Sequence, residues 1–261
     1  MKRQLKLVIS LLVRGWDIIH DAFCRLLRRP LPARCMVLYY HAVPAHHREL
    51  FARQLDAILQ CARPIPSDPA APLTPGFRYA SITFDDGFVS VLQNAAPELA
   101  RRRIPWTIFV PSGCLGRQPD WVRAPHAAAR QDRVMTSEEL RKLICDPLVT
   151  VASHTVNHTN LLEMDSRRAF EELARSRADL ESVVGRPVVQ FSYPFGARSA
   201  VLDQQARAAG YTRVFCSDPV HAFRSNNEAA TGRASVDPDM PRLEFRLKLL
   251  GAYRWHSLLH R

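Results

Sequence analysis

Two adjacent carboxylates end an apolar run in the segment Ser81-Ile82-Thr83-Phe84-Asp85-Asp86-Gly87. Like charges at the mouth of a strand repel each other, and partial desolvation adds to the cost unless a positive group lies beside them. An Asp-Gly pair is also common in turns, so this segment alone fits an ordinary strand-end turn as well as a cation site.

Two histidines, His154 and His158, follow another apolar run and are four residues apart. One helical turn or a tight loop with this spacing brings both imidazoles within reach of a single ion. Such a pair alone is more often an ordinary surface feature. Together with a strand-end carboxylate, it makes the two-histidine, one-carboxylate set of catalytic zinc sites, which leaves coordination positions open. A second carboxylate would then be available as a general base.

The elements that must position these residues alternate between strand and helix. Strands are expected at 35–40, 79–84, 105–110, 149–153, 188–192 and 212–216. Helices are expected at 49–62, 88–103, 136–144, 166–184, 199–209 and 241–260, with loops over 63–76 and most of 217–240. This alternation predicts a parallel sheet or barrel. No Gly-rich phosphate loop follows a strand, which disfavours a nucleotide-binding fold.

The unusual residues all fall just past expected strand ends. They are His41, the Asp85-Asp86 pair, the His154–His158 pair and the segment Tyr193-Pro194-Phe195-Gly196. In a (β/α) barrel these positions share one face, and that face carries the chemistry.

Three segments resemble, in order and spacing, the first three motifs of the polysaccharide deacetylase family, also called the NodB-homology family. They are Thr83-Phe84-Asp85-Asp86-Gly87, Ser153-His154-Thr155-Val156-Asn157-His158 and Phe191-Ser192-Tyr193-Pro194-Phe195-Gly196. The segments 38–41 and 232–237, with the helix that carries Phe51 and Gln54, resemble its exopolysaccharide-associated branch. The resemblance implies an α/β fold, a distorted (β/α) barrel with about six or seven parallel strands.

The same resemblance implies removal of acetyl groups from N-acetylated sugars of a polysaccharide or oligosaccharide. The cofactor would be a divalent metal, with zinc favoured over cobalt, nickel or another ion. By position, the metal ligands would be Asp86, His154 and His158. The catalytic residues would be Asp85 as base and Phe195 through its backbone N–H to the oxyanion, and we add Arg233 as a candidate partner of the base. The substrate-binding residues would be Tyr193 and Pro194, and the strand-end position of His41 adds it as a further candidate.

The chain departs from the family pattern at two points. Many members have an arginine just before the Pro-aromatic-Gly segment, where Ser192 and Tyr193 stand here. Either Arg233 or Arg198 could orient Asp85 instead. The Leu-x-x-His setting of the family's general acid also has no clean match, and the candidates are His221 first, then His126 and His41.

The first segment, 1–29, is basic and has apolar residues at helical spacing. It predicts an N-terminal amphipathic helix that lies on a membrane or packs on the domain. The net charge of +11 is concentrated towards the chain ends, and no nucleic-acid signature accompanies it. We therefore expect peripheral membrane contact and a membrane or cell-envelope location, with the cytoplasm as the alternative. The six cysteines lack CxxC spacing, which disfavours a cysteine-zinc site or a disulfide framework.

The expected organisation is a helical segment at 1–29, a catalytic domain at 34–250 and a C-terminal helix within 241–261, on or beside the barrel. Two other functions remain open at this stage. One is a different metal-dependent amide hydrolase, which would use the same site. The other is a non-catalytic glycan-binding or membrane-associated relative, which the missing arginine favours and the intact Asp-Asp-His-His set disfavours. Nothing in the sequence predicts an oligomeric state.

Overall fold

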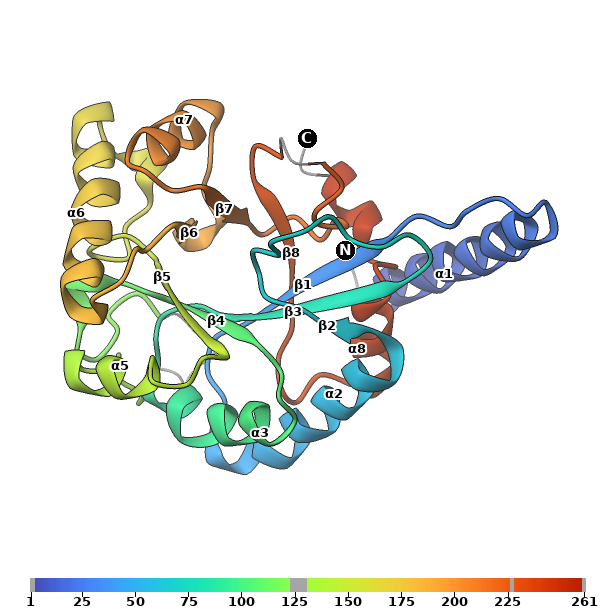
Figure 1. Cartoon of the computed structure of the whole chain (residues 1–261), viewed down its shortest axis with the longest axis horizontal. Helices are drawn as coiled ribbons and strands as arrows, with labels where there is room; N and C mark the ends of the chain where they lie inside the picture. The colour runs from blue at the N-terminus through green and yellow to red at the C-terminus, as the bar shows by residue number, and fades with distance from the viewer. Residues whose placement is uncertain (1–2, 123–130, 226–227, 260–261) are drawn as a thin grey trace.

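Parallel strands close into a ring in the computed structural model, which describes residues 3–122, 131–225 and 228–259 (Figure 1). The ring order is β1–β3–β4–β5–β6–β7–β8, and β8 pairs with β1 to close it. The strand bounds are Arg34–Tyr40 (β1), Arg78–Phe84 (β3), Trp106–Val110 (β4), Val149–Ser153 (β5), Gln190–Ser192 (β6), Arg213–Cys216 (β7) and Thr231–Ser235 (β8). A short β2, Arg63–Pro64, pairs with the start of β3. The predicted (β/α) barrel is confirmed.

Helices lie outside the ring, and most of them connect successive strands (Figure 1). Their bounds are Arg3–Leu26 (α1), Arg48–Cys61 (α2), Ala96–Arg101 (α3), Ser137–Leu143 (α5), Ser166–Val184 (α6), Ala200–Ala208 (α7) and Arg242–Leu249 (α8). Short 3₁₀ turns are Ala45–His47 (η1), Ser112–Cys114 (η3), Leu161–Glu163 (η4), Pro194–Gly196 (η5) and Arg254–Leu259 (η6), and Val91–Ala95 (η2) is a π-helical turn. None of the described helices is long and apolar enough to cross a bilayer.

Alternation of side chains along the strands divides the apolar core into two layers. In β1, Leu38 and Tyr40 point outward into the large cluster between the strands and the helices. Val37 belongs instead to a small cluster with Phe109 and Phe215. Most of the core therefore lies outside the ring.

Two strands lie where we expected loops. β8 has the sequence Thr-Gly-Arg-Ala-Ser, which has no apolar run, and it nevertheless completes the ring between β7 and β1. β8 is buried because Arg233 pairs with Asp85, which is distant in the sequence, and a local pattern does not reveal such a pair. The two-residue β2 is too short to have a sequence signal of its own.

Two expected helices are shorter than predicted. The 88–103 helix is a π-helical turn followed directly by α3, and Pro97, which has no N–H to donate, lies just after that wider turn. The terminal helix, expected over 241–260, ends as α8 at Leu249. Gly251 then adopts a φ of 75° and the chain continues into η6.

Candidate metal centre and catalytic pocket

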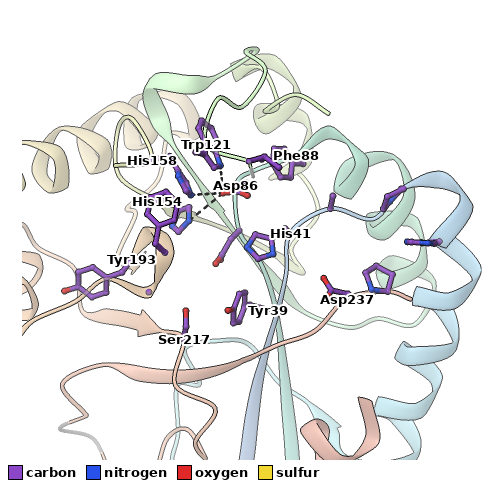
Figure 2. Close-up of a pocket in the computed structure, with 18 of the residues that line it drawn as sticks. Tyr39, His41, Asp86, Phe88, Trp121, His154, His158, Tyr193, Ser217 and Asp237 are labelled. Carbon is purple, nitrogen blue, oxygen red and sulfur yellow. Dashed lines mark hydrogen bonds and ion pairs between the residues drawn. The ribbon is translucent and has the colours of Figure 1, made fainter. Parts of the chain in front are cut away.

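The ends of β3 and β5 bring one carboxylate and two imidazoles together (Figure 2). The Asp86 Oδ1 lies 3.0 Å from the His158 Nε2 and 3.8 Å from the His154 Nε2. All three residues are buried, and their candidate ligand atoms lie within 4.8 Å of one another. Two nitrogen donors and one carboxylate suit zinc and similar divalent cations. The residues predicted as ligands are therefore close enough to share one ion.

The surroundings of His154 favour metal ligation. Its Nδ1 lies 2.7 Å from the carbonyl oxygen of Ser192, which turns the Nε2 toward Asp86. Burial lowers the pKa of His154 to about 4, so the imidazole is neutral at pH 7, as a ligand must be. Burial would raise the pKa of Asp86, but the hydrogen bond and charge of His158 lower it to about 2. Both groups thus hold the protonation state that a cation requires.

The backbone is strained at this end of the barrel. Asp86, His158 and Phe195 have φ values of 69°, 53° and 59°, in the left-handed region that non-glycine residues rarely adopt. Each such residue costs on the order of 1–3 kcal/mol and persists where its surroundings hold it. Three of the residues that the sequence assigns to chemistry are therefore held in strained backbone conformations.

Helix α6 holds the histidine loop in place. The Glu172 carboxylate accepts hydrogen bonds from the backbone N–H groups of Val156, at 2.8 Å, and Asn157, at 3.1 Å. The Ser176 hydroxyl donates to the Thr155 carbonyl at 2.8 Å. These contacts satisfy loop groups between the two histidines, which helps to fix the spacing of His154 and His158. The sequence did not identify Glu172, because its hydrogen-bond partners lie in a different element, well before it in the chain.

The second carboxylate, Asp85, is paired with Arg233 inside the ring. The guanidinium donates to both carboxylate oxygens, at 2.7 and 2.8 Å, and both side chains are buried. It also donates to the Ser192 hydroxyl at 2.6 Å and lies 4.5 Å from the centre of the Tyr39 ring. Burial would raise the pKa of Asp85, but the charge of Arg233 outweighs it and the pKa lies below its ordinary value. Asp85 is therefore ionised at neutral pH.

Of the two arginines left open by the sequence, Arg233 reaches Asp85. Arg198 forms an ion pair with Asp203 instead. Ser192, in the place where the family pattern has an arginine, is small and contacts the Arg233 guanidinium through its hydroxyl. An arginine from β8 thus occupies the neighbourhood where the resemblance expected one from the end of β6.

A cavity of about 680 Å³ opens onto these residues. Besides both carboxylates and both histidines, its wall includes Tyr39, His41, Trp121, Tyr193, Phe195 and Ser217. The Tyr193 hydroxyl donates to Asp203 at 3.0 Å, and its side chain points away from the metal-binding residues (Figure 2). Pro194 is buried and is not among the wall residues of the described chain. Any contact of Tyr193 with substrate must therefore come from its backbone or ring rather than from its hydroxyl.

Trp121 is a site residue that sequence analysis did not assign. Its indole stacks on the His158 ring with centroids 4.4 Å apart, and its Nε1 donates to the Asp86 Oδ1 at 3.3 Å. The Phe195 ring contacts another side of the imidazole edge-on, with centroids 4.8 Å apart. Aromatic rings thus hold His158 from two directions. The one sequence signal was a tryptophan in an otherwise polar insertion.

The histidines that the sequence offered as general acid lie in different places relative to the cavity. His41 lies on the cavity wall, just after β1. His221 lies outside the cavity and packs so closely on Gly251 that an added Cβ there would come within 2.3 Å of its ring. Burial lowers the pKa of His221 to about 4. His126 lies outside the described residues.

The barrel and its strand-end site together define a metal-dependent hydrolase. A family model described as polysaccharide deacetylase matches residues 73–214, more than half of the chain. The chain belongs to the polysaccharide deacetylase family. It is accordingly a hydrolase that acts on the carbon–nitrogen bonds of N-acetylated sugars.

Relatives and solved structures agree with this membership. YxkH of Bacillus subtilis (strain 168), named as a candidate polysaccharide deacetylase, is 23% identical over 220 residues, covering 80% of this chain and 74% of its own. The structure of IcaB from Ammonifex degensii has a TM-score of 0.71 and 26% identity, covering 85% of this chain and 98% of that one. The Streptococcus pyogenes deacetylase PplD in complex with acetate shares the fold, with a TM-score of 0.65, 18% identity and coverage of 84% and 98%.

Proposed function

We propose that this protein removes N-acetyl groups from amino sugars within a polysaccharide or oligosaccharide, using Asp85 as the base beside a cation held by Asp86, His154 and His158. The observation that carries the proposal is the arrangement of the two carboxylates. Asp86 faces two imidazoles, whereas Asp85 faces a guanidinium, and both line the same cavity. Neighbouring groups with such different surroundings take different roles in a reaction.

The donor set fits a divalent cation, and we propose zinc. The oriented imidazole of His154 and the short distance between Asp86 and His158 match the needs of a zinc ligand set. The chemistry that such a cation supplies when bound is Lewis acidity, which polarises an amide carbonyl and lowers the pKa of a water molecule.

Asp85 accepts the proton of the attacking water. Arg233 binds both carboxylate oxygens, which fixes the orientation of the carboxylate and keeps it ionised. Full burial of the guanidinium excludes water from that side of the pair. Arg233 is thus a positioning residue that acts through Asp85.

The remaining groups bind and orient the acetyl group. The backbone N–H of Phe195, in its left-handed turn, donates to the developing oxyanion. The rings of Phe195 and Trp121 form an apolar wall beside His158 that accommodates a methyl group. His41, on the same cavity wall, supplies the proton to the departing amine. No observation on the described residues favours a different amide substrate or a non-catalytic protein.

Acetate release tests the proposal. The full chain is treated with a chelator and then incubated with N-acetylglucosamine oligomers and zinc, cobalt or nickel. Released acetate should depend on added metal and be absent from an Asp85→Asn control. If no metal supports release from any such oligomer and no metal co-purifies, the proposal fails.

A polymer substrate also bears on where the enzyme works. We propose a membrane surface or the cell envelope, where such polymers are assembled or displayed. Fractionation of cells that express the full chain tests this proposal, and recovery in the soluble cytoplasmic fraction alone would contradict it.

A further inference from the structure

Helix α1 turns its polar residues toward the domain, where Leu7 and Val13 are also partly buried, and its main apolar stripe outward. Ser10, Asp17 and Asp21 are the buried residues of this helix. A central stripe of large apolar side chains faces away from the domain, each 50–69% exposed: Leu5, Val8, Leu12, Trp16, Ile19 and Phe23. We call this stripe the outer face of α1. A helix on a soluble domain ordinarily packs its apolar side inward, so this orientation is the reverse of the usual one.

Ion pairs fix this orientation. The Asp17 carboxylate accepts two hydrogen bonds from Arg254, at 2.8 and 2.7 Å. Asp21 accepts two from Arg34, both at 2.7 Å, and a third from Arg78 at 3.1 Å. Rolling α1 to bury its apolar side on the barrel would separate these pairs and leave buried charges without partners. The domain therefore presents the outer face to its surroundings.

Within segment 3–29, the charged groups that the barrel does not pair have a single sign. Asp17 and Asp21 are the acidic residues of the segment 3–29, and both are buried in ion pairs with the rest of the domain. The exposed ionic groups near the end of α1 are Arg25, Arg28 and Arg29, all basic. An apolar stripe with a basic rim complements a surface that is apolar inside and anionic at its boundary.

We propose that the outer face of α1 binds an anionic lipid bilayer, with the helix lying in the plane of the membrane surface. The helix is about 36 Å long, and its stripe is larger than the scattered apolar exposure of soluble proteins. Trp16, two-thirds exposed within the stripe, suits the headgroup boundary. A second copy of this chain would set one basic rim against another, whereas anionic headgroups neutralise it.

Membrane binding leaves the catalytic cavity open. Arg34 and Arg78, which hold Asp21, are the first residues of β1 and β3. His41 and Asp85 follow the last residues of the same strands, roughly 20 Å away for strands of this length. Figure 1 shows α1 at one side of the barrel, beside the C-terminal segment. Lipid binding is therefore separable from hydrolysis, and neither proposal depends on the other.

Vesicle flotation with the full chain tests the proposal. The protein is mixed with vesicles of phosphatidylcholine alone, or of phosphatidylcholine with phosphatidylglycerol. The wild type should float with the anionic vesicles. Leu12→Glu/Ile19→Glu should weaken this binding about 100-fold, because it replaces two apolar side chains that the membrane would bury with charged ones. The matched control, Leu162→Glu/Val201→Glu, changes two side chains that are 53% and 58% exposed elsewhere and should bind like the wild type.

Three results would overturn the proposal. The first is wild-type protein that does not float with anionic vesicles. The second is undiminished binding by Leu12→Glu/Ile19→Glu, with the circular dichroism spectrum unchanged. The third is a wild-type dimer that becomes monomeric in that variant without any binding to vesicles, which would assign the outer face to a second copy. Brominated lipids should also quench tryptophan fluorescence of the wild type and not that of Trp16→Phe.

Discussion

The two ends of β1 and β3 carry the same kind of ion pair in different surroundings. Asp85 with Arg233 at one end, and Asp21 with Arg34 at the other, are each joined by two hydrogen bonds of 2.7–2.8 Å. In both cases burial would raise the pKa of the carboxyl group, and the arginine brings it below the ordinary value. Asp85 also lines a cavity shared with two histidines, whereas Asp21 joins a helix to the barrel. The neighbours of such a pair, rather than the pair itself, indicate chemistry.

The largest expected difference between the two ends is in turnover. Asp85→Asn removes the base and should lower acetate release by roughly 10²- to 10⁴-fold, while the bound metal is retained. Asp21→Asn, the same substitution at the other end, should leave turnover per folded molecule unchanged. Comparable losses in both variants, or full turnover in Asp85→Asn, would break the distinction between the ends.

Removal of the arginines should separate the two ends by stability and by pH dependence. Arg233→Ala leaves a buried carboxylate without its partner and should cost about 3–5 kcal/mol in urea unfolding. Arg34→Ala should cost less, because Arg78 still donates to Asp21. In Arg233→Ala the pKa of Asp85 should rise, so the acidic limb of the pH–rate profile moves to higher pH. An unmoved acidic limb would show that Arg233 does not act through Asp85.

Each end also has a tryptophan whose indole N–H donates a hydrogen bond. One bond supports the candidate metal site and the other supports the packing of α1. Trp121→Phe keeps an aromatic ring on His158 but loses the hydrogen bond to Asp86, and should weaken metal affinity about tenfold. Trp255→Phe loses a 3.0 Å hydrogen bond to Ser10 and should leave metal affinity unchanged. Competition with a chromophoric chelator measures both. Equal affinities for the two variants would remove Trp121 from the support of the metal site.

The smallest expected effect is the pH dependence of the pair at Asp21. The folded pKa of Asp21 lies below its ordinary value of 3.8. The stabilisation is therefore complete above the ordinary value and is lost as pH falls through the folded one. The difference in melting temperature between wild type and Asp21→Asn should be constant near neutral pH and shrink below pH 3.8. A difference that stays constant into strong acid would contradict this account of the pair.

Local sequence patterns were enough to predict the strand ends and the residues that share an ion. Asp86, His154 and His158 lie in short segments whose spacing is set by a strand and the turn that follows it, so the fold brings them together in a predictable way. The barrel follows from strand–helix alternation for the same reason. Long-range pairing explains the omissions: β8 has no apolar run, and the choice between Arg233 and Arg198 depends on partners distant in sequence.

The orientation of α1 on the barrel shows a second limit of prediction from sequence. Helical spacing predicted an apolar side, and both a packing helix and a membrane helix fitted that pattern. The orientation is decided by Asp17 and Asp21, whose partners Arg254 and Arg34 lie in other elements. Periodicity identifies an apolar face but does not tell which way the helix turns it.

The central claim is that Asp86, His154 and His158 hold the cation on which deacetylation depends. Its most direct test is metal titration of chelator-treated protein, with bound zinc and acetate release from N-acetylglucosamine oligomers measured on the same samples. Acetate release should rise in proportion to occupancy up to one equivalent per chain, and His154→Ala should neither bind that equivalent nor release acetate. Acetate release that survives complete metal removal, or full zinc binding by His154→Ala, would contradict the claim.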